Sequence, residues 1–553
     1  MTTAFTTNLH ELRAVANGID VKFKNGKTLD QRLTGKFYTP GAIGQRLAAD
    51  ISLEAIAQRD SLSIIDPFCG DGRLIYWFIS HIANHESLTQ IKKINVSLWD
   101  CDAEAVEEAR RKISAIKLPY PLLVDARVTD SFFESTKAFG EYDICLTNPP
   151  WETLKPDSRE LANLDDDQRE RYTQLLKNKS FLLDGMFPQS RSLKKFSGWG
   201  TNLARCGIEA AVKLLKPGGL YGIVAPSTIF GDQSSVRLRT WLFEQNAISR
   251  LRYYPAEARL FEKVDQGVTC LMGIADGKSN AVIPAEIHSS TVDEESTRTS
   301  LRLDDLAAHD YSIGFSSDQR IVEIMERLSH LPTLAEFEGS GKDQIKLGRE
   351  LDETGLAAKL ADSGKYIFLK GKYVSRYKTL PHDETWVSDS VAVPKSADTH
   401  RIAWRDVSRQ SMAHRVQATL IEPGVVTGNS LNIGYFNSGE NTEALQALLA
   451  IFNSSIFEIQ ARLRISTNHL SVGAVRKFRI PNINDSAIVS ELAEHARLYR
   501  KNSTVDNLFD LDKAIARHFD LNIRDLTVIY EFLRKNDSVA DSLYVSLKRE
   551  NVE

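Results

Sequence analysis

The feature that most constrains the fold of this chain is an alternation of apolar and amphipathic segments between residues 37 and 275. Apolar runs typical of strands occur at 61–65, 95–99, 122–124, 142–146, 220–225 and 268–274. Helical patterns lie between them, notably at 40–57, 73–82, 103–116 and 203–215. Strands that alternate with helices form βαβ units, so the sequence predicts an α/β fold with a mostly parallel sheet. Thr39 before Pro40 predicts a helix N-cap with proline in the first turn.

The ends of the first three predicted strands carry residues that suit a nucleoside. The first strand runs into the glycine turn Asp66-Pro67-Phe68-Cys69-Gly70-Asp71-Gly72, where glycines let the backbone approach a ligand closely. The glycine spacing is not that of a dinucleotide fingerprint. The second strand ends at Asp100, a carboxylate that can accept both hydroxyls of a ribose. Asp130 follows the third strand and could accept the amino group of an adenine.

The fourth predicted strand ends in Asn148-Pro149-Pro150-Trp151. The side-chain oxygen of Asn148 and the carbonyl of Pro149 could each accept one N–H of a planar amino group. Proline has a fixed φ and no amide hydrogen, which keeps these acceptors aimed, and Trp151 offers a π-face for a flat ring. Each motif alone is weak evidence, but their order along the chain predicts a nucleoside pocket beside a site for an exocyclic amine.

These motifs together resemble those of the S-adenosylmethionine-dependent amino-methyltransferases of bacterial restriction–modification systems. The resemblance is closest to the N6-adenine class in the gamma-type motif order, in which a target-recognition domain follows the catalytic region. Gly35-Lys36-Phe37-Tyr38-Thr39-Pro40 is similar to the family's N-terminal motif, which packs over the methionine part of the cofactor. Specific motifs cover roughly residues 31–275, and looser similarity continues to about residue 482. The resemblance implies a Rossmann-like class I methyltransferase domain, a C-terminal α+β target-recognition domain and a helical tail.

The resemblance also implies roles for individual residues. The residues expected to bind S-adenosylmethionine are Phe37, Tyr38, Thr39, Asp66, Phe68, Gly70, Gly72, Asp100, Asp130 and Asn148. Asp125 is a second candidate for the adenine contact, and Asp130 is preferred because two phenylalanines follow it. The residues expected at the reaction centre are Asn148, Pro149, Pro150, Trp151 and Phe261. Phe261 would line the second face of a target adenine rotated out of the duplex, although a core phenylalanine fits its position about equally well. No metal, general base or covalent nucleophile is required.

At 553 residues the chain is too long for a single core, and this length predicts two or three domains. The predicted division is a methyltransferase domain over 1–280, a transition region over 281–344, a target-recognition domain over 345–482 and a helical region over 483–553. Residues 151–200 are predicted to form an insertion near the DNA face. No apolar run reaches the roughly 18–20 residues that span a bilayer, and the N-terminus lacks a signal-peptide pattern. Five cysteines without a CxxC pair are typical of a cytoplasmic protein.

Basic residues concentrate in the C-terminal half although the formal net charge of the chain is −4. The stretches predicted to face double-stranded DNA are 370–378, 401–415, 427–430 and 462–469. The individual residues expected to contact DNA are Lys370, Lys372, Tyr373, Arg376, Arg405, Asn429 and Arg464. A single Lys or Arg in such a stretch is more often a solvated surface residue, so the prediction concerns the groups.

The sequence therefore predicts a site-specific adenine-N6 DNA methyltransferase that protects host DNA from a separately encoded restriction endonuclease. One alternative is the same chemistry on RNA or on a protein glutamine. Nearly 280 residues follow the catalytic region, and a segment of this size favours a DNA-reading module over that alternative. A second is the methylase part of a fused restriction–modification enzyme, for which the sequence offers no nuclease-like segment. A third is a non-catalytic binding subunit, which the intact Asn148–Trp151 turn disfavours.

Overall fold

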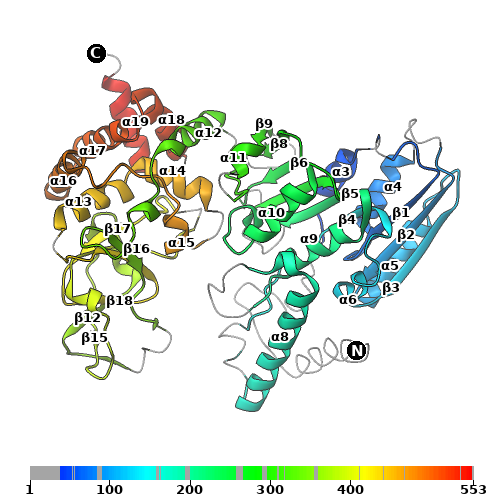
Figure 1. Cartoon of the computed structure of the whole chain (residues 1–553), viewed down its shortest axis with the longest axis horizontal. Coiled ribbons are helices and arrows are strands. Elements are labelled where there is room, and N and C mark those ends of the chain that lie inside the picture. Colours follow the sequence, from blue (N-terminus) through cyan, green and yellow to red (C-terminus); the bar gives the residue numbers. More distant parts are fainter. Residues whose placement is uncertain are drawn as a thin grey trace. The chain divides into compact units, whose positions relative to one another are not determined.

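The computed structural model describes residues 38–52, 54, 56–83, 90–156, 161, 164–192, 200–256, 266–288, 296–307, 310–316, 318–353, 356, 359–409, 412–439, 441–465, 468–535 and 537–550 (Figure 1). The chain divides into two compact units, Met1–Ser317 and Asp318–Glu553. The division falls inside the range 281–344 that the sequence predicts as a transition region.

The first unit is built on one nine-stranded sheet with the order β3-β2-β1-β4-β5-β7-β6-β8-β9. Its strands are β1 (Ser61–Asp66), β2 (Lys93–Asp100), β3 (Leu122–Val128), β4 (Tyr142–Thr147), β5 (Leu215–Pro226), β6 (Ala247–Tyr254), β7 (Val268–Ile274), β8 (Val282–His288) and β9 (Ser296–Arg302). Strands β1 to β5 are parallel, and β7 runs antiparallel to both β5 and β6. The predicted α/β fold with a mostly parallel sheet is confirmed. Because β1 pairs with β2 on one side and β4 on the other, the order reverses beside β1, where ligands bind in open α/β sheets.

Helices cover both faces of this sheet (Figure 1). Apolar residues of α3 (Gly41–Asp50), α4 (Arg73–Ile82) and α5 (Ala103–Ser114) form one core with β1, β2 and β4. On the opposite face, α9 (Leu203–Lys213) and α10 (Val236–Gln245) pack against β4, β5 and β6. The central strands β1, β4, β5 and β7 are largely buried, with helices on both faces of the sheet, which explains why they appear in the sequence as continuous apolar runs.

Two features of the first unit differ from the sequence expectations. The predicted Thr39 cap is wrong, because α3 begins at Gly41 with Pro40 as its N-cap and the Pro40 carbonyl accepts the amide of Ile43 at 3.1 Å. Strands β6, β8 and β9 were not expected, and β8 and β9 lie in the range 281–344. The edge strand β9 has the sequence STRTSLR and no buried residue, so no apolar pattern indicates it.

The segment after β4 contains a long helix, α8 (Asp166–Met186), which extends away from the sheet (Figure 1). Its N-terminus is closed by a capping box in which Asp165 and Gln168 satisfy each other's backbone amides. Leu175, Leu176 and Leu183 pack with Phe132, which belongs to α6 (Ser131–Ser135). Residues 188–190 and 227–230 form the short helices η3 (Pro188–Ser190) and η4 (Ser227–Phe230).

The second unit combines small sheets with a bundle of helices. Its strands form the sheets β10-β19-β16-β17, β11-β15-β12-β18 and β13-β14, with bounds β10 (Ile345–Gly348), β11 (Leu360–Ala361), β12 (Tyr366–Leu369), β13 (Val374–Ser375), β14 (Lys378–Thr379), β15 (Trp386–Val387), β16 (Arg401–Arg405), β17 (Ala418–Ile421), β18 (Val425–Thr427) and β19 (Leu431–Phe436). Its helices include α12 (Gln319–Arg327), α13 (Thr442–Phe452), α14 (Ser455–Arg464), α15 (Val472–Val475), α16 (Ser486–Lys501), α17 (Val505–His518), α18 (Ile523–Leu533) and α19 (Ser538–Glu550).

One hydrophobic core joins the strands and the helices of the second unit. It contains Ile345 and Trp404 from the first of these sheets together with Leu511 and Ile529 from the C-terminal helices. The helical tail therefore folds against the strand region instead of forming a separate body. Within the described residues no single helix has the length and apolar composition to cross a membrane. Helices α13 and α14 reach this length and composition only when they are taken together. They are bent by 61° relative to each other and are largely buried in this core.

Candidate functional site

The candidate site lies at the carboxyl edge of the sheet, where β1 and β4 end side by side. The hydroxyl of Thr147, the last residue of β4, donates to Oδ1 of Asp66, the last residue of β1, at 2.7 Å. The Phe68 amide donates to the same oxygen at 3.1 Å. Asp66 is 1% exposed, and this burial raises the pKa of its carboxyl to about 7. This contact joins the glycine turn after β1 to the turn that begins at Asn148.

The raised pKa of Asp66 predicts a pH-dependent stability of the first unit. Because the folded protein holds a proton that the unfolded chain has released, this carboxyl makes the wild type less stable as pH rises from about 4 to 7. Asp66→Asn keeps the acceptor oxygen and has no such titration. We expect the stability of the variant relative to wild type to increase by about 3 kcal/mol between pH 5 and pH 8. Urea unfolding of both proteins at the two pH values measures this change, and an unchanged difference would contradict the assignment.

The glycine turn after β1 is held by the turn after β2. Gly70 and Gly72 adopt positive φ angles of 48° and 74°, which favour glycine, and a Cβ on Gly72 would lie 2.8 Å from the Cβ of Ala109. The Asp100 carboxylate accepts the Gly70 amide at 2.9 Å through Oδ2 and the Asp102 amide at 3.0 Å through Oδ1. Burial raises the pKa of the Asp100 carboxyl. The sequence-predicted residues Gly70, Gly72 and Asp100 therefore come together at one edge.

The described part of the N-terminal motif lies over this glycine turn. A Cβ on Gly70 would approach the ring of Tyr38 to 3.1 Å, so the ring covers the turn directly. Arg73, the first residue of α4, holds the motif in place: its guanidinium lies 4.9 Å from the Tyr38 ring centroid and donates to the Thr39 carbonyl at 3.1 Å. The sequence did not indicate this role for Arg73. Phe37 lies outside the described residues.

The two candidates for an adenine contact differ in position. Asp130 follows the carboxyl end of β3, caps α6 by accepting the Phe132 amide at 3.1 Å, and lies 3.5 Å from the Lys179 ammonium. Asp125 lies in the middle of β3, with half of its side chain exposed, and forms an ion pair with Arg127 at 2.6 Å. Only Asp130 is at the same edge as Asp66 and Asp100. The ring of Phe132 packs 5.0 Å from that of Phe68, which brings that predicted residue to the site.

The turn from Asn148 to Trp151 is packed against helix α9. Pro149 and Pro150 are buried, whereas Asn148 and Trp151 are partly exposed. A Cβ on Gly207 of α9 would lie only 2.2 Å from the Cβ of Pro149, so the helix approaches the turn as closely as glycine allows. The sequence did not indicate Gly207. Phe261 lies outside the described residues, so its predicted place opposite Trp151 stays a prediction.

Five of the seven residues predicted to contact DNA gather around the short helix η10 (Gly371–Tyr373) of the second unit. They are Lys370, Lys372, Tyr373, Arg405 and Asn429. Arg405 donates to the Val374 carbonyl at 2.6 Å and to the Lys372 carbonyl at 3.0 Å, and the Ser430 hydroxyl accepts the Gly371 amide at 2.8 Å. Lys372 is exposed and extends over the Tyr373 ring at 4.6 Å. Arg405 thus stabilises the segment that carries the exposed lysine.

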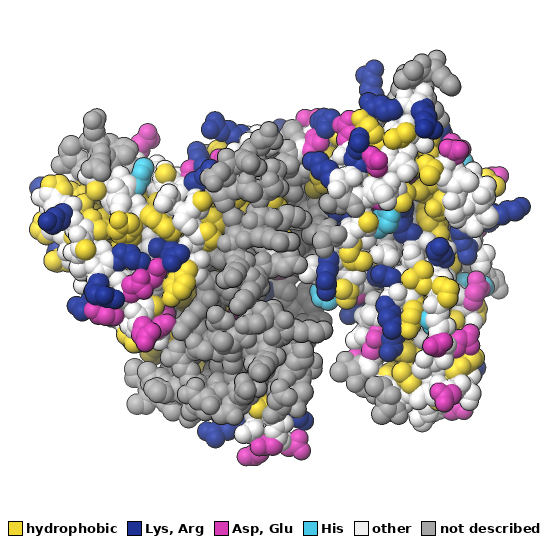
Figure 2. Space-filling view, turned by 180° about the vertical axis from the view of Figure 1, so that it is seen from behind, with side chains coloured by type: hydrophobic (Ala, Val, Ile, Leu, Met, Phe, Trp, Pro, Cys, Tyr) yellow, Lys and Arg dark blue, Asp and Glu magenta, His cyan; other side chains and the backbone are white. Residues whose placement is uncertain are grey.

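The other two predicted DNA contacts lie away from η10. The guanidinium of Arg376 donates to the Asn453 carbonyl and lies against His414, so it faces the helical core of the second unit. Arg464, at the end of α14, donates to the Lys477 carbonyl at 3.4 Å. Figure 2 shows Lys and Arg side chains spread over the visible face of this unit, with Asp and Glu between them.

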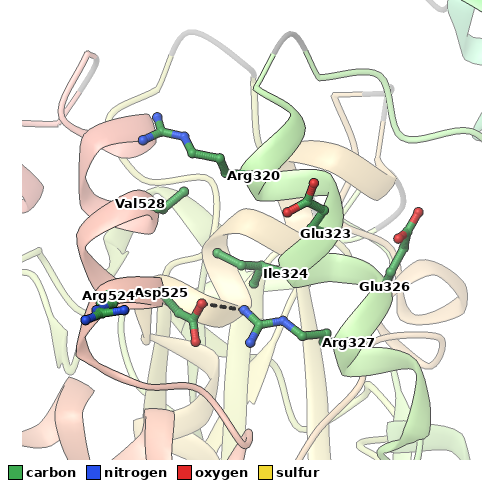
Figure 3. A pocket seen from close by; sticks show the side chains of 8 residues that line it. All are labelled: Arg320, Glu323, Ile324, Glu326, Arg327, Arg524, Asp525 and Val528. Atoms are coloured by element: carbon green, nitrogen blue, oxygen red, sulfur yellow. Dashed lines mark hydrogen bonds and ion pairs between the residues drawn. The ribbon is translucent and has the colours of Figure 1, made fainter. Parts of the chain in front are cut away.

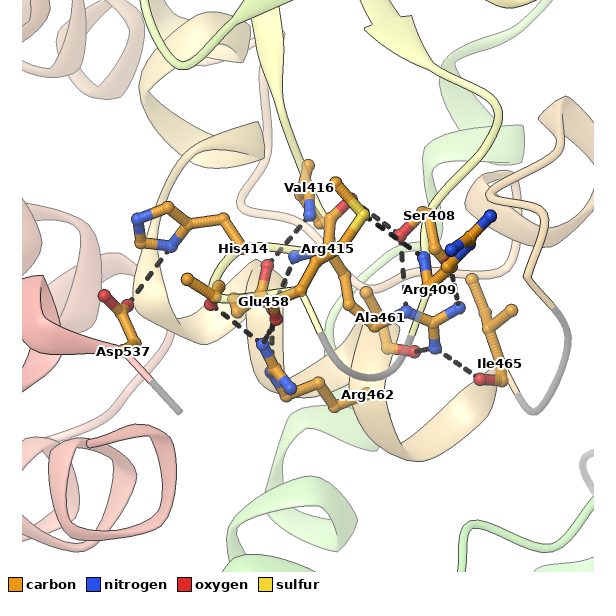
Figure 4. Close-up of polar contacts among 12 residues, drawn as sticks. Ser408, Arg409, His414, Arg415, Val416, Glu458, Ala461, Arg462, Ile465 and Asp537 are labelled. Carbon is orange, nitrogen blue, oxygen red and sulfur yellow. Dashed lines mark hydrogen bonds and ion pairs between the residues drawn. The ribbon is translucent and has the colours of Figure 1, made fainter. Parts of the chain in front are cut away.

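The prediction that the whole stretch 401–415 faces DNA is wrong for two of its arginines. Arg401 is fully buried and pairs with the buried Glu350 at 3.3 Å. Arg415 is also fully buried and donates to the carbonyls of Ala461 at 2.8 Å and Ser408 at 3.0 Å (Figure 4). Glu458 accepts the Arg415 amide at 2.9 Å. These arginines satisfy buried carbonyls, a use of positive charge that composition alone cannot separate from DNA binding.

A groove of about 630 Å³ lies between α12 and α18 of the second unit (Figure 3). Its arginines are largely paired with carboxylates, because Arg327 contacts Asp525 and Arg320 lies 2.9 Å from Glu531. None of the residues predicted for the site lines this groove. All of its lining residues belong to the second unit.

Similarity of this chain to known proteins is found among solved structures. A scan of the sequence against protein-family models finds no match, and a search of curated proteins also finds none. The type IIL restriction–modification enzyme MmeI, solved in complex with DNA, is similar with a TM-score of 0.54 at 12% identity, over 93% of this chain and 80% of that chain. The type IIG restriction endonuclease BpuSI has a TM-score of 0.40 at 14% identity, over 93% of this chain and 67% of that chain. A class I S-adenosylmethionine-dependent methyltransferase described as putative, from Listeria monocytogenes, has a TM-score of 0.32 at 17% identity, over 49% of this chain and 70% of that chain.

The likeness to MmeI extends over both units of the chain. It shows that this chain shares the fold of that enzyme, with a first unit built on a mostly parallel α/β sheet and a second unit of mixed α and β structure.

Proposed function

We propose that this protein is an S-adenosylmethionine-dependent DNA methyltransferase that modifies the N6 amino group of adenine within a restriction–modification system. One observation carries the proposal. The turn from Asn148 to Trp151, which suits a planar amino group, is bonded through Thr147 and Asp66 to the glycine turn of a nucleoside pocket. A methyl donor and a methyl acceptor held at these two turns would meet at one edge of the sheet.

The residues around the glycine turn fit S-adenosylmethionine. Gly70 and Gly72 take positive φ angles and let the turn pack closely under the Tyr38 ring and against Ala109. Asp100 would accept the ribose hydroxyls, and Asp130 would accept the adenine amino group, each from the end of its own strand. When bound there, S-adenosylmethionine supplies a methyl group on a sulfonium centre that a nitrogen lone pair can attack.

The acceptor turn would prepare the amine for this attack. The Asn148 side-chain oxygen and the Pro149 carbonyl would accept the two amino hydrogens, which localises the lone pair that the adenine ring otherwise delocalises. Trp151 would stack on one face of the base, which must leave the duplex to reach the turn. The two acceptors would hold the hydrogens until one proton is lost to solvent. Catalysis would come from positioning and from prearranged acceptors, without a metal or a covalent intermediate on the enzyme.

The second unit is proposed to read the DNA sequence. The likeness to MmeI, whose structure contains DNA, covers this unit as well as the first, and the segment around η10 presents the exposed Lys372 beside the partly exposed Tyr373. Arg376 and Arg464 remain predicted DNA contacts, although each also binds a backbone carbonyl. A separately encoded restriction endonuclease is proposed as the partner of this protein.

The two lysines near η10 give a test of the DNA-binding surface. If Lys370 and Lys372 each neutralise a phosphate, their joint replacement by alanine should reduce the slope of log affinity against log salt by about 2. DNA affinity measured by fluorescence anisotropy at several salt concentrations gives this slope. Lys501→Ala, which removes an exposed lysine at the end of α16, serves as the control and should leave the slope unchanged. An equal slope for the double variant and wild type would remove this segment from the DNA surface.

Transfer of labelled methyl groups tests the proposed function directly. The purified chain is incubated with labelled S-adenosylmethionine and, separately, with duplex DNA of mixed sequence, RNA or a glutamine-containing protein. We expect label on duplex DNA as N6-methyladenine, identified by nucleoside mass spectrometry. Label on RNA or protein would show that this molecule, and not DNA, is the substrate. Label on cytosine would show that cytosine, and not adenine, is the target base. Cofactor binding without transfer to any of them would favour a non-catalytic subunit.

A further inference from the structure

Helix α8 touches both halves of the candidate site through two successive residues. The ammonium of Lys179 lies 3.5 Å from Oδ2 of Asp130, which is the carboxylate proposed to contact the cofactor adenine. The hydroxyl of the next residue, Ser180, donates to the Leu154 carbonyl at 3.3 Å, three residues after Trp151. A single turn of one helix therefore connects the cofactor pocket with the chain that leaves the acceptor turn.

The connection at Ser180 is reinforced by Thr201, which precedes α9. The Thr201 amide donates to the Ser180 hydroxyl at 3.4 Å, and the Thr201 hydroxyl donates to Asp184 of α8 at 2.8 Å. The Leu154 amide in turn donates to the Thr201 carbonyl at 2.8 Å, and the Leu203 amide donates to the Glu152 carbonyl at 2.8 Å. The segment that follows Trp151 is thus fixed between α8 and the start of α9.

The ion pair of Lys179 is not needed to hold α8 in place. The helix already buries Tyr172, Leu176 and Leu183 in an apolar cluster with Phe132 and Phe187. Lys179 is only 13% exposed and Asp130 is 21% exposed, so both charges have lost part of their hydration to meet. A partly desolvated pair between a helix and a ligand-contacting carboxylate is typical of a functional link more than of packing.

We propose that Lys179 is a positioning residue that couples cofactor binding to the acceptor turn, an inference that rests on the proposed function. A cofactor adenine at Asp130 would exclude water from the Asp130–Lys179 pair and strengthen its attraction, because screening falls with the local dielectric. The strengthened pair fixes the turn of α8 that carries Ser180, and this turn contacts Leu154 directly and through Thr201. Coupling of this kind is reciprocal, so an occupied acceptor turn also favours cofactor binding.

Hydrogen exchange of the full chain tests this coupling without DNA. S-Adenosylhomocysteine is the probe, and the amides of Leu154 and Leu203 report the contacts of the acceptor segment. In wild type we expect the probe to slow their exchange by about fivefold, and in Lys179→Met we expect this effect to be largely lost. Lys179→Arg should restore it in part. Arg171→Met removes an exposed charge from the same helix and should behave as wild type.

The outcomes separate failure of the inference from failure of the proposed function. If wild type does not bind S-adenosylhomocysteine in calorimetry, the proposed function fails and the inference with it. If wild type binds and Lys179→Met keeps the full slowing of exchange, only the inference is overturned. Ser180→Ala breaks the other end of the link and should give the same loss, which keeps the test decisive if Lys179→Met fails to fold. For methyl transfer we expect Lys179→Met to lower kcat about tenfold with KM for the cofactor within about threefold.

Discussion

Replacement of Asn148 by alanine is expected to lower kcat for methyl transfer by about a thousandfold while the Kd for S-adenosylmethionine stays within about threefold. The side-chain oxygen of Asn148 is the acceptor proposed to hold one amino hydrogen of the target base, and alanine offers no acceptor. Gly70, Asp100 and Asp130, which are proposed to bind the cofactor, belong to other strand ends and keep their own contacts. Single-turnover transfer to duplex DNA and calorimetry of cofactor binding measure the two quantities.

Asn178→Ala is the matched control for this experiment. Asn178 is an exposed asparagine of α8 whose side chain accepts from Gln174 at 2.9 Å, so its removal should leave both quantities at the wild-type values. Near-wild-type transfer by Asn148→Ala would remove Asn148 from the reaction centre. A loss of cofactor binding equal to the loss of transfer would instead assign Asn148 to the cofactor pocket alone.

Replacement of Gly207 by alanine is expected to lower methyl transfer by about a hundredfold, since a displacement near 1 Å at the reacting groups costs roughly that much. The added Cβ would lie 2.2 Å from the Cβ of Pro149, a ring that cannot rotate away, so the helix or the acceptor turn must shift. We also expect the free energy of unfolding to fall by about 1–3 kcal/mol, the usual cost of overpacking a core. Single-turnover kinetics and urea unfolding report the two effects.

Gly185→Ala separates this steric effect from the general effect of alanine in a helix. Gly185 lies in α8 and a Cβ there would meet no atom within 4 Å, so this variant should keep wild-type transfer. Its stability should rise by about 0.5–1 kcal/mol, because alanine loses less backbone entropy than glycine on folding. If Gly207→Ala transfers methyl groups as fast as Gly185→Ala, the packing of α9 does not position the acceptor turn.

Much of the first unit could be predicted because its signals are local. Buried parallel strands appear as apolar runs, and the carboxyl ends of neighbouring strands must share an edge, so Asp66, Asp100, Asp130 and Asn148 could be placed together from their order alone. The polar edge strand β9 was not predicted, because an edge strand can fold without an apolar face. Arg73, Lys179 and Gly207 were also not predicted, since their partners lie far away in the sequence.

In the second unit, sequence alone could not assign uses to basic residues. Arg401 and Arg415 look like their surface neighbours in composition, yet both are fully buried and bind carbonyls or a carboxylate. Lys372 of the same unit is exposed and lies over the partly buried Tyr373 ring. Whether a guanidinium faces solvent depends on how strands distant in the chain pack together, which no local pattern records.

The sequence by itself determined the α/β class of the first unit and the residues at the ends of its strands, because strand periodicity and turn chemistry are properties of neighbouring residues. Only the tertiary structure decided how those ends are joined. The bond from Thr147 to Asp66, the close approach of Gly207 to Pro149 and the contact of Lys179 with Asp130 all connect residues brought together by packing. Such contacts depend on distances in space, which the order of residues along the chain does not contain.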